Sequence, residues 1–432
     1  NMAQALFQVR ASSVHPATSQ AMLQDVFGER LTGCEPTWYQ GFPSAYYNDS
    51  HRAFRKKCRD FVENEMKPHA DEWIKSPGGY PVSLHEKAYK AGVQGIVFPK
   101  EFGGSREDHD YFHELILWDE LGRCTGGVLA QLSINSMGMP PVSAHGSKEL
   151  KARVIPPVVR GEKTIALMIS EPHAGSDVAG IKCTAEKHGD HYVVNGQKKW
   201  ITGGHRADFY TCAVRTGEGM SLLLIEKGMP GLSVRKMETQ FDNSNGTAFV
   251  TLEDVKVPAS NLIGKEGEGF KYLMHNFNHE RFVIAVGASR GSRNCYEESI
   301  KYAMKRKTFG KPMIEHQAIR MKLAEMLRQI EALHDSCERV AYAMSQGVPD
   351  YEFGATCALL KVNGSKCFEF CAREASQIFG GSSIVREGQG KLVERMYRDV
   401  RASAIPGGSE EILLDFSIRN SVAKYAKLQS KQ

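Results

Sequence analysis

The sequence predicts a multidomain α+β protein in which helices come first, an antiparallel β domain follows and a helical bundle ends the chain. Three observations support this order. Residues 47–163 carry a helical pattern, residues 164–264 alternate with a period of two, and apolar residues after 265 recur at spacings of four and three. Periods of 3.6 and 2 distinguish helices from half-buried strands.

Residues 1–46 precede the helical pattern and carry Pro, Gly and aromatic residues with little periodicity. We expect them to form an arm that wraps the body. Within the arm, Met2–Gln24 has no acidic residue, one Arg and several Ser and Thr, which partly matches a transit peptide. The compartment is left open between the mitochondrial matrix and the cytoplasm.

The helical part, residues 47–163, contains two local signals. Ser83–Glu86 fits a capping box at the start of a helix, with a Glu three residues after a Ser. Phe98–Gly104 contains Pro and a Gly pair, which predicts the end of a helix and a loop.

The β domain, residues 164–264, contains short segments that alternate between apolar and polar residues, such as 191–196 and 248–252. Gly189 and the stretch Gly228–Gly231 supply turns between them.

The bundle, residues 265–432, contains a long predicted helix that ends at Gly347–Pro349. A second helix is expected over about 353–379. The first has a seam of buried positions with alternating spacings of four and three: Ile319, Leu323, Met326, Ile330, Leu333, Cys337, Val340 and Met344.

Composition excludes several classes of protein. The chain has 432 residues, 41% hydrophobic residues and 24% charged residues, as in ordinary globular proteins. A net charge of +5 is too small to indicate nucleic acid binding, and no apolar run is long enough to span a membrane. The ten cysteines form no Cys-x-x-Cys pair, which argues against a zinc cluster or a disulfide framework and favours a reducing compartment.

Two segments of the β domain have the character of a flavin site. Ile169–Gly180 follows an apolar strand and is rich in small and hydroxyl residues, so its backbone can approach an anion or a polar ring edge closely. Lys199–Gly204 supplies Trp200 and, two residues later, Thr202. On a strand these two positions share one face, where an aromatic wall and a hydrogen-bond donor suit a flat cofactor. Either segment alone is equally consistent with a hairpin and a core Trp.

Together the two segments resemble the signature of the acyl-CoA dehydrogenase family, and the similarity extends over about residues 47–425. It implies an N-terminal helical domain, a middle β domain, a C-terminal four-helix bundle and an FAD cofactor. Residues 305–311 resemble a basic block that reaches the FAD of a neighbouring subunit, although such a block is also seen in nucleic-acid patches. The implied FAD contacts are Leu167, Ile169, Ser170, Ser176, Trp200, Ile201, Thr202, Arg306, Thr308, Phe309, His316, Gln317, Gln377, Gly380, Gly381, Ser409 and Glu411.

The catalytic base is the sharpest inference from the resemblance. Many family members carry a catalytic glutamate at the position of Gly407, and this chain does not. The isovaleryl-CoA and long-chain acyl-CoA dehydrogenases carry it instead on an inner helix, immediately before an arginine. Glu280 precedes Arg281 in the same way. An ordinary solvated helix pair is the alternative interpretation of these two residues.

The resemblance implies removal of the α-proton of an acyl-CoA by Glu280, while the backbone N–H of Gly407 binds the thioester oxygen. Ser176, Asn278 and Arg281 would hold the substrate. Electrons would pass to an electron-transfer flavoprotein, and the contacts between subunits imply a dimer or a tetramer. An oxidase that uses oxygen and a non-catalytic flavin-bound relative are the alternatives. Gly138 and two prolines that follow it slightly favour a deep pocket for medium or long acyl chains.

Overall fold

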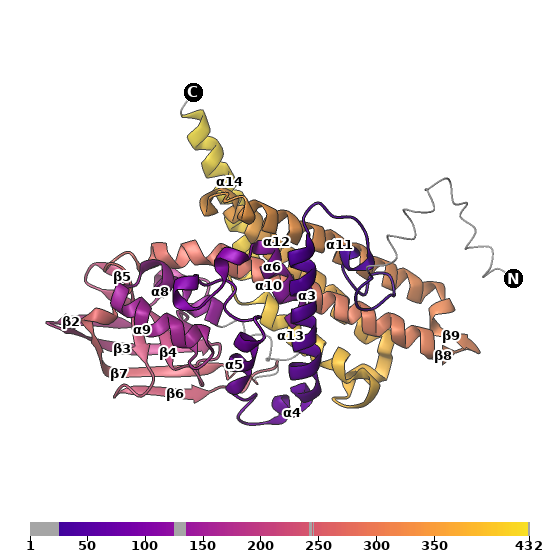
Figure 1. Cartoon of the computed structure of the whole chain (residues 1–432), viewed down its shortest axis with the longest axis horizontal. Coiled ribbons are helices and arrows are strands. Elements are labelled where there is room, and N and C mark those ends of the chain that lie inside the picture. The colour runs from indigo at the N-terminus through magenta and orange to yellow at the C-terminus, as the bar shows by residue number, and fades with distance from the viewer. Residues whose placement is uncertain (1–25, 125–134, 242–243, 245, 431–432) are drawn as a thin grey trace.

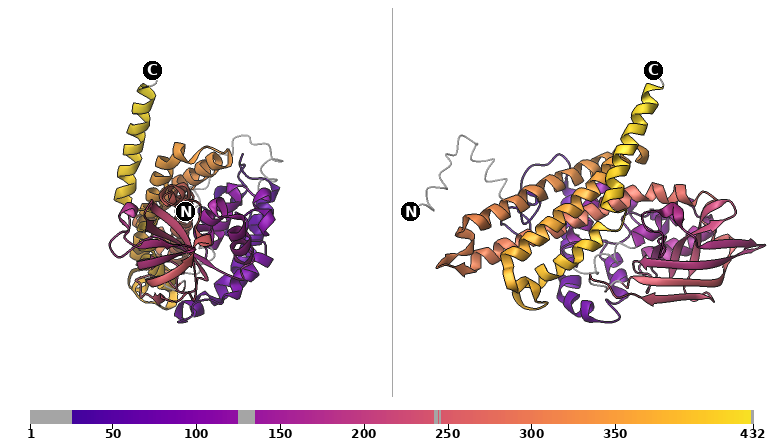
Figure 2. Two further views of the ribbon diagram at one scale, coloured as in Figure 1. Left: turned by 90° about the vertical axis from the view of Figure 1, so that its left-hand side faces the viewer. Right: turned by 180° about the vertical axis from the view of Figure 1, so that it is seen from behind.

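The computed structural model describes residues 26–124, 135–241, 244 and 246–430. The transit-peptide-like segment Met2–Gln24 lies outside these residues. A twisted sheet occupies one end of the molecule, long helices run away from it, and the shorter helices pack along one side (Figure 1). The C-terminal helix leaves the body and projects from it (Figure 2).

Side-chain caps start three of the helices before the sheet, and Ser147 is the cap of α9. Asn48 accepts N–H groups at the start of α3, and Asp110 does the same for α6. The capping box predicted at Ser83 is wrong, because this residue is already helical and its helix starts without a side-chain cap. The helices before the sheet are α3 (Asp49–Phe61), α4 (Ala70–Lys75), α5 (Ser83–Lys90), α6 (Tyr111–Leu121), α8 (Pro140–His145) and α9 (Lys148–Val159).

The starts of α3 and α6 are joined through a shared carboxylate. Asp110 lies 3.1 Å from Nε2 of His51 and 2.8 Å from Nδ1 of His113. These three side chains are close enough together to hold a metal ion. Their polar atoms are already engaged in the two caps, since His51 Nδ1 also accepts the N–H of Asn48 at 3.0 Å. The cluster is therefore explained by the fold.

The sheet is largely antiparallel, as predicted, but its first strand is not. Strand β1 pairs in parallel with β4, and β2 also meets β4 in parallel. Parallel neighbours need a long connection, and the chain between β1 and β4 contains the turn at 169–183 and the β2–β3 hairpin. The strands are β1 (Ile165–Met168), β2 (Thr184–His188), β3 (His191–Ile201), β4 (Phe209–Thr216), β5 (Gly219–Glu226), β6 (Leu232–Lys236) and β7 (Ala248–Pro258), in the order β1-β4-β2-β3-β7-β6 with β5 beside β4.

Long helices form the C-terminal part, and both predicted long helices are confirmed by α11 and α12. The central helix α10 packs against both of them. In the described residues, none of the helices has the length and apolar character that a membrane span requires. The helices are α10 (Gly269–Lys305), α11 (Gln317–Ser345), α12 (Asp350–Phe379), α13 (Lys391–Ala404) and α14 (Glu410–Gln429), and the short strands β8 (Lys307–Thr308) and β9 (Lys311–Pro312) follow α10.

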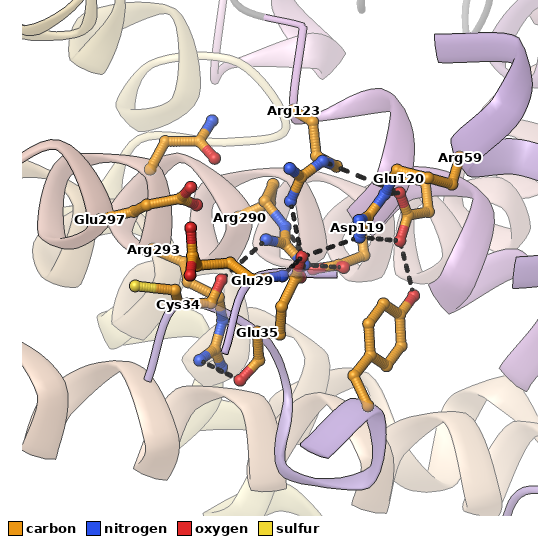
Figure 3. A network of polar contacts seen from close by, with 12 residues as sticks. Glu29, Cys34, Glu35, Arg59, Asp119, Glu120, Arg123, Arg290, Arg293 and Glu297 are labelled. Atoms are coloured by element: carbon orange, nitrogen blue, oxygen red, sulfur yellow. Dashed lines mark hydrogen bonds and ion pairs between the residues drawn. The ribbon is translucent and has the colours of Figure 1, made fainter. Parts of the chain in front are cut away.

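Residues 26–46 of the predicted arm are fastened to the helices by a buried network of charges (Figure 3). The carboxylate of Glu35 accepts from Arg59 at 3.0 Å, Arg123 at 3.1 Å and Arg290 at 3.2 Å. Burial alone would raise the pKa of Glu35, but the three guanidinium groups hold it below its usual value. The arm is therefore fixed to α3, to the turn after α6 and to α10 by a compensated buried charge.

Candidate active site

The turn after β1 is held in place by two lysines of β3. The carbonyl oxygen of Ile169 accepts from Nζ of Lys198 at 2.9 Å, and that of Ser170 accepts from the N–H of Lys199 at 2.9 Å. Lys198 is fully buried and also lies 2.9 Å from the carboxylate of Glu171. The two predicted flavin segments are therefore in direct contact through their backbones and this buried ion pair.

Trp200 has an unusual backbone. Its φ is +59°, in the left-handed region, and the pairing of β3 with β7 shifts between Lys198 and Ile201. Thr202 lies beyond the end of the strand. The prediction that Trp200 and Thr202 share one strand face is therefore wrong. The bulge instead leaves the indole 49% exposed, while Ile201 is buried.

The loop after β1 reaches the turn before α14, so two distant predicted segments meet. Oγ of Ser176 accepts the backbone N–H of Ser409 at 3.3 Å. Ser409 is the N-cap residue of α14, and Glu411 is exposed in its first turn. Leu167, on β1, is half-buried at the same end of the molecule. One group of predicted cofactor residues is thus assembled between the sheet and the last turn.

Glu280 lies on α10 and is only 7% exposed. Its Oε1 accepts from Nδ2 of Asn276 at 2.7 Å. Burial raises the pKa of Glu280 to about 7, although His279, Arg281 and the hydrogen bond from Asn276 all oppose this shift. The solvated-pair interpretation of Glu280 and Arg281 does not hold, because a carboxyl group in this position is dry and titrates near neutral pH.

Gly407 lies beside the same stretch of α10. Its carbonyl oxygen accepts from Nε of Arg281 at 3.3 Å, and its φ is +72°. A Cβ at this position would come 2.9 Å from Cδ1 of Ile284 and would require a backbone conformation that L-residues rarely adopt. The structure thus brings the two predicted catalytic positions, Glu280 and Gly407, into one place and gives a local reason for glycine in the turn.

Asn278 and Arg281 are both engaged within the protein. Nδ2 of Asn278 donates to the carbonyl oxygen of Asp350 at 2.9 Å, and its Oδ1 lies 3.4 Å from Nη1 of Arg281. Burial lowers the pKa of Arg281. These contacts join α10 to the start of α12 and to the last turn, and substrate binding by the two residues stays a prediction.

The other predicted cofactor residues lie at the far end of α10, in the hairpin of β8 and β9 (Figure 1). Oγ1 of Thr308 is 3.0 Å from Nε2 of His316. Phe309 forms the tip, with an exposed fraction of 96% and a φ of +50°. Arg306 and Gln317 flank the hairpin and are exposed.

The end of α12 lies at this same far end, because the ring of Phe379 stacks on Tyr302 of α10 at 4.1 Å between centroids. Gln377, Gly380 and Gly381 are exposed there. Arg306 follows Glu280 by 26 positions on α10, which is about 39 Å along a helix. The two groups of predicted residues therefore cannot touch the same ring system within one chain.

Backbone strain offers a test of whether these residues fit a planar cofactor. Among the described residues other than glycine, those with a positive φ are Trp200, Asp254 and Phe309. Two of these three are predicted flavin contacts, and both expose a large aromatic ring. Strained, exposed aromatic residues are costly unless something packs on them, and such strain gathers at functional sites. Trp200 on β3 and Phe309 in the hairpin after α10 therefore fit a flat aromatic ligand.

Models of three acyl-CoA dehydrogenase domains match the chain in order: the N-terminal domain over residues 48–162, the middle domain over 166–255 and the C-terminal domain over 267–422. The chain belongs to the acyl-CoA dehydrogenase family. The acyl-CoA dehydrogenase apdG of Emericella nidulans is 38% identical over 424 residues, which cover 92% of this chain and 96% of that protein. The predicted family, fold class and oxidoreductase class are thereby confirmed.

Solved acyl-CoA dehydrogenases share the same architecture. The acyl-CoA dehydrogenase of Geobacillus kaustophilus has a TM-score of 0.82 and 32% identity, covering 87% of this chain and 99% of that one. The acyl-CoA dehydrogenase of Bacillus anthracis, complexed with FAD, has a TM-score of 0.84 and 28% identity over 89% of this chain and 69% of that one. Enzymes of this family use FAD, which confirms the predicted cofactor. An acyl-CoA substrate and an oligomeric assembly both fit the family.

Sequence reasoning missed several residues around this acyl-CoA dehydrogenase site. Asn276 was detectable, because it stands four positions before Glu280 and so shares its helix face. The pair Glu114 and His279 joins helices 165 positions apart in sequence, and no local pattern indicates it. Lys361 stands in an apolar stretch of α12. A lysine in such a stretch weakly indicates that its charge is buried and supports the fold.

Proposed function

We propose that the protein catalyses the FAD-dependent α,β-dehydrogenation of an acyl-CoA thioester to the trans-2-enoyl-CoA. The observation that carries this proposal is Glu280, a buried carboxyl group with a pKa raised to about 7, beside the turn at Gly407. The reaction would belong to fatty-acid or branched-chain acyl oxidation, and the electrons would pass to an electron-transfer flavoprotein.

Glu280 would act as the general base. A base with a pKa near the working pH combines a substantial ionised fraction with strong affinity for the proton. In this step the α C–H bond breaks, its proton goes to the Glu280 carboxylate, and the β-hydrogen leaves with its electron pair. FAD, when bound, supplies the acceptor for that hydride.

The turn at Gly407 would stabilise the charge that develops on the thioester oxygen. A backbone N–H that is already oriented costs no reorganisation when negative charge appears. Arg281 supports the turn because its Nε donates to the carbonyl oxygen of Gly407 and so holds the adjoining peptide, between Gly407 and Gly408. Ser170 and Thr202 would bind the edge of the ring system, Trp200 would cover it, and Ser176 would help hold the CoA.

A second copy of the chain would complete the cofactor site. The residues at the far end of α10, including Arg306, Phe309 and Gln377, are exposed, and Arg306 lies about 39 Å along the helix from Glu280. They can contribute to a flavin site only by reaching a neighbouring subunit. We therefore propose that the protein forms at least a homodimer. Two such dimers would pair to form a homotetramer.

The test is an anaerobic titration of the FAD-loaded enzyme with acyl-CoAs from isovaleryl to palmitoyl, following the flavin absorption band. Wild type is expected to bleach with one length class, and Glu280→Gln is expected to retain FAD but not to bleach. Glu298→Gln is the matched control, since Glu298 is a half-buried glutamate farther along the same helix. Full bleaching of the Glu280→Gln variant would remove this residue from the reaction. Stoichiometric hydrogen peroxide in air would indicate an oxidase.

A further inference from the structure

The residue before the proposed base takes part in a buried ion pair between two helices. Helix α6 packs against α10, and Oε1 of Glu114 on α6 lies 2.6 Å from Nε2 of His279 on α10. The side chain of Glu114 is 3% exposed and that of His279 is 18% exposed. Nε1 of Trp118, from the same helix as Glu114, also donates to Oε1 at 3.4 Å. The packing of the two helices therefore removes most of this pair from water.

The pairing favours the charged form of His279. Burial disfavours a protonated imidazole, but the Glu114 carboxylate outweighs burial and raises the pKa of His279. Asp350 at the start of α12 and Glu280 on α10 act in the same direction as Glu114. Opposite charges attract each other strongly in a medium of low polarity. The geometry thus holds a cation on the residue next to the base.

The charge of His279 reaches Glu280, which is the next residue on α10. Their side chains leave the helix about 100° apart and roughly 1.5 Å apart along its axis. Burial raises the pKa of Glu280 to about 7, and His279 opposes this rise more than Arg281 or the hydrogen bond from Asn276 does. Glu114 contacts Nε2, at the outer end of the imidazole, so the positive member of the pair belongs to the helix that carries the base.

We infer that Glu114 and His279 are positioning residues that keep a positive charge beside Glu280 and so keep part of this base ionised at neutral pH. Glu114 acts through His279, because its carboxylate holds the proton on the imidazole, and the imidazolium then stabilises the carboxylate of Glu280. A buried carboxyl group without such a cation would be mostly protonated and could not accept the α-proton. The inference rests on the proposed dehydrogenation and describes how pH regulates its base.

This arrangement predicts a shift of unusual sign. Removing a negative charge near a carboxyl group ordinarily lowers the pKa of that group, because repulsion is relieved. In Glu114→Gln, however, loss of the carboxylate also releases the proton of His279, and the base loses its neighbouring cation. The pKa of Glu280 is therefore expected to rise. The acidic limb of the kcat/KM profile should move upward by about one pH unit, the low end of the range for a nearby opposite charge.

The experiment measures kcat/KM between about pH 5.5 and 9.5 for the FAD-loaded enzyme, with the acyl-CoA that bleaches the flavin best. Glu114→Gln and His279→Gln should both move the acidic limb upward. The double variant should move it no further than His279→Gln does, because Glu114 acts only through the imidazole. His279→Lys keeps a cation for Glu114 and should restore most of the wild-type position.

Glu374→Gln is the matched control. Glu374 is also a buried glutamate, paired with Lys322 in another part of the bundle, and its variant should keep the wild-type limb.

A second measurement needs no turnover. Infrared difference spectra of the holoenzyme at stepped pH, with those of Glu280→Gln subtracted, follow the band of the protonated Glu280 carboxyl group. The midpoint of this band should be higher in Glu114→Gln than in wild type, by the same amount as the acidic limb.

Three results would overturn the inference. A downward shift in Glu114→Gln would show that its carboxylate acts on the base directly. A loss of rate with no shift in either measurement would show that the pair only joins α6 to α10. If Glu114→Gln does not fold, equal limbs in His279→Lys and His279→Gln would have the same meaning.

Failure of the proposed dehydrogenation would look different. In that case no acyl-CoA would bleach the flavin, whereas the infrared midpoint would still show whether Glu114 and His279 set the pKa of Glu280.

Discussion

Nδ2 of Asn276 lies 2.7 Å from Oε1 of Glu280, one helical turn farther along α10. The same amide group donates to the carbonyl oxygen of Met137 at 3.3 Å. Asn276 thus anchors the proposed base to the segment before α8. Because the amide donates to the carboxylate, it favours the ionised form and opposes the rise in pKa that burial causes.

Replacing Asn276 by Leu is expected to move the pH dependence of the reaction. Without the donor, the pKa of Glu280 rises further above about 7, so the ionised base appears only at higher pH. The acidic limb of the kcat/KM profile should shift upward by about one to two pH units, since a hydrogen bond to a charged group is worth about 1.5–3 kcal/mol. Steady-state rates between pH 5.5 and 9.5 measure this shift.

Asn294→Leu is the control for this shift. Asn294 lies on the same helix as the base but away from it, and its Nδ2 donates to the carbonyl oxygen of Gly122 at the end of α6. Its profile should keep the wild-type limb. A uniform loss of rate in Asn276→Leu, with no shift along the pH axis, would contradict the assigned role.

Lys361 is expected to hold the last turn in place. Its ammonium group is fully buried and donates to the carbonyl oxygens of Ala404 and, at 2.9 Å, Gly408. Burial lowers the pKa of Lys361 to about 8. Lys361→Met leaves two carbonyl groups unsatisfied, at about 1–3 kcal/mol each, and removes the contacts on both sides of the turn that contains Gly407.

The expected result for Lys361→Met is a fall in kcat of about tenfold or more with FAD content close to wild type, together with a lower midpoint of urea unfolding. Lys361→Arg should restore part of the rate because it keeps buried donors. Lys366→Met, an exposed lysine on the same helix, should change neither quantity. Loss of stability with an unaltered kcat would assign Lys361 to folding alone.

The sequence could predict the parts of this enzyme that depend on neighbouring residues. The alternating seam from Ile319 to Met344 predicted α11, which runs from Gln317 to Ser345, because a helix buries residues at regular spacing. The Glu280–Arg281 dipeptide identified the candidate base through its resemblance to the inner-helix pattern of the family. The family resemblance was needed to choose it, because Glu338–Arg339 on α11 and Glu394–Arg395 on α13 repeat the same dipeptide.

Features that depend on contacts between distant segments could not be predicted in this way. The left-handed backbone of Trp200 arises where β3 shifts its register against β7, and strand periodicity assumes that no such shift occurs. The pairing of Glu114 with His279 requires α6 and α10 to be packed together first. No local pattern indicates that Glu35 would fasten the arm to the helices through three arginines.

Glu35→Gln is expected to destabilise the folded enzyme by about 3–5 kcal/mol, the usual cost of removing one partner from a buried ionic network. The change keeps the side-chain shape but leaves three buried guanidinium groups with less negative charge near them. Urea unfolding at pH 7 measures the effect.

Glu63→Gln is the control, because Glu63 contacts Arg123 from a partly exposed position. This substitution should lower the free energy of unfolding by less than about 1 kcal/mol. Similar losses in the free energy of unfolding in both variants would show that the buried position of Glu35 adds nothing to its contribution.

Phe309→Gly separates the strain of the hairpin tip from its function. Glycine adopts the φ of +50° without penalty, so the variant should fold at least as well as wild type. The exposed ring is lost, however, and with it the proposed contact to the cofactor of a neighbouring subunit, which would be worth about 1.5–3 kcal/mol. FAD affinity, measured by fluorescence titration, should therefore fall by roughly 10- to 100-fold.

Tyr351→Ala removes another exposed aromatic ring, on α12, and should leave FAD affinity unchanged. Unchanged affinity in Phe309→Gly would instead mean that this aromatic tip lies outside the cofactor site.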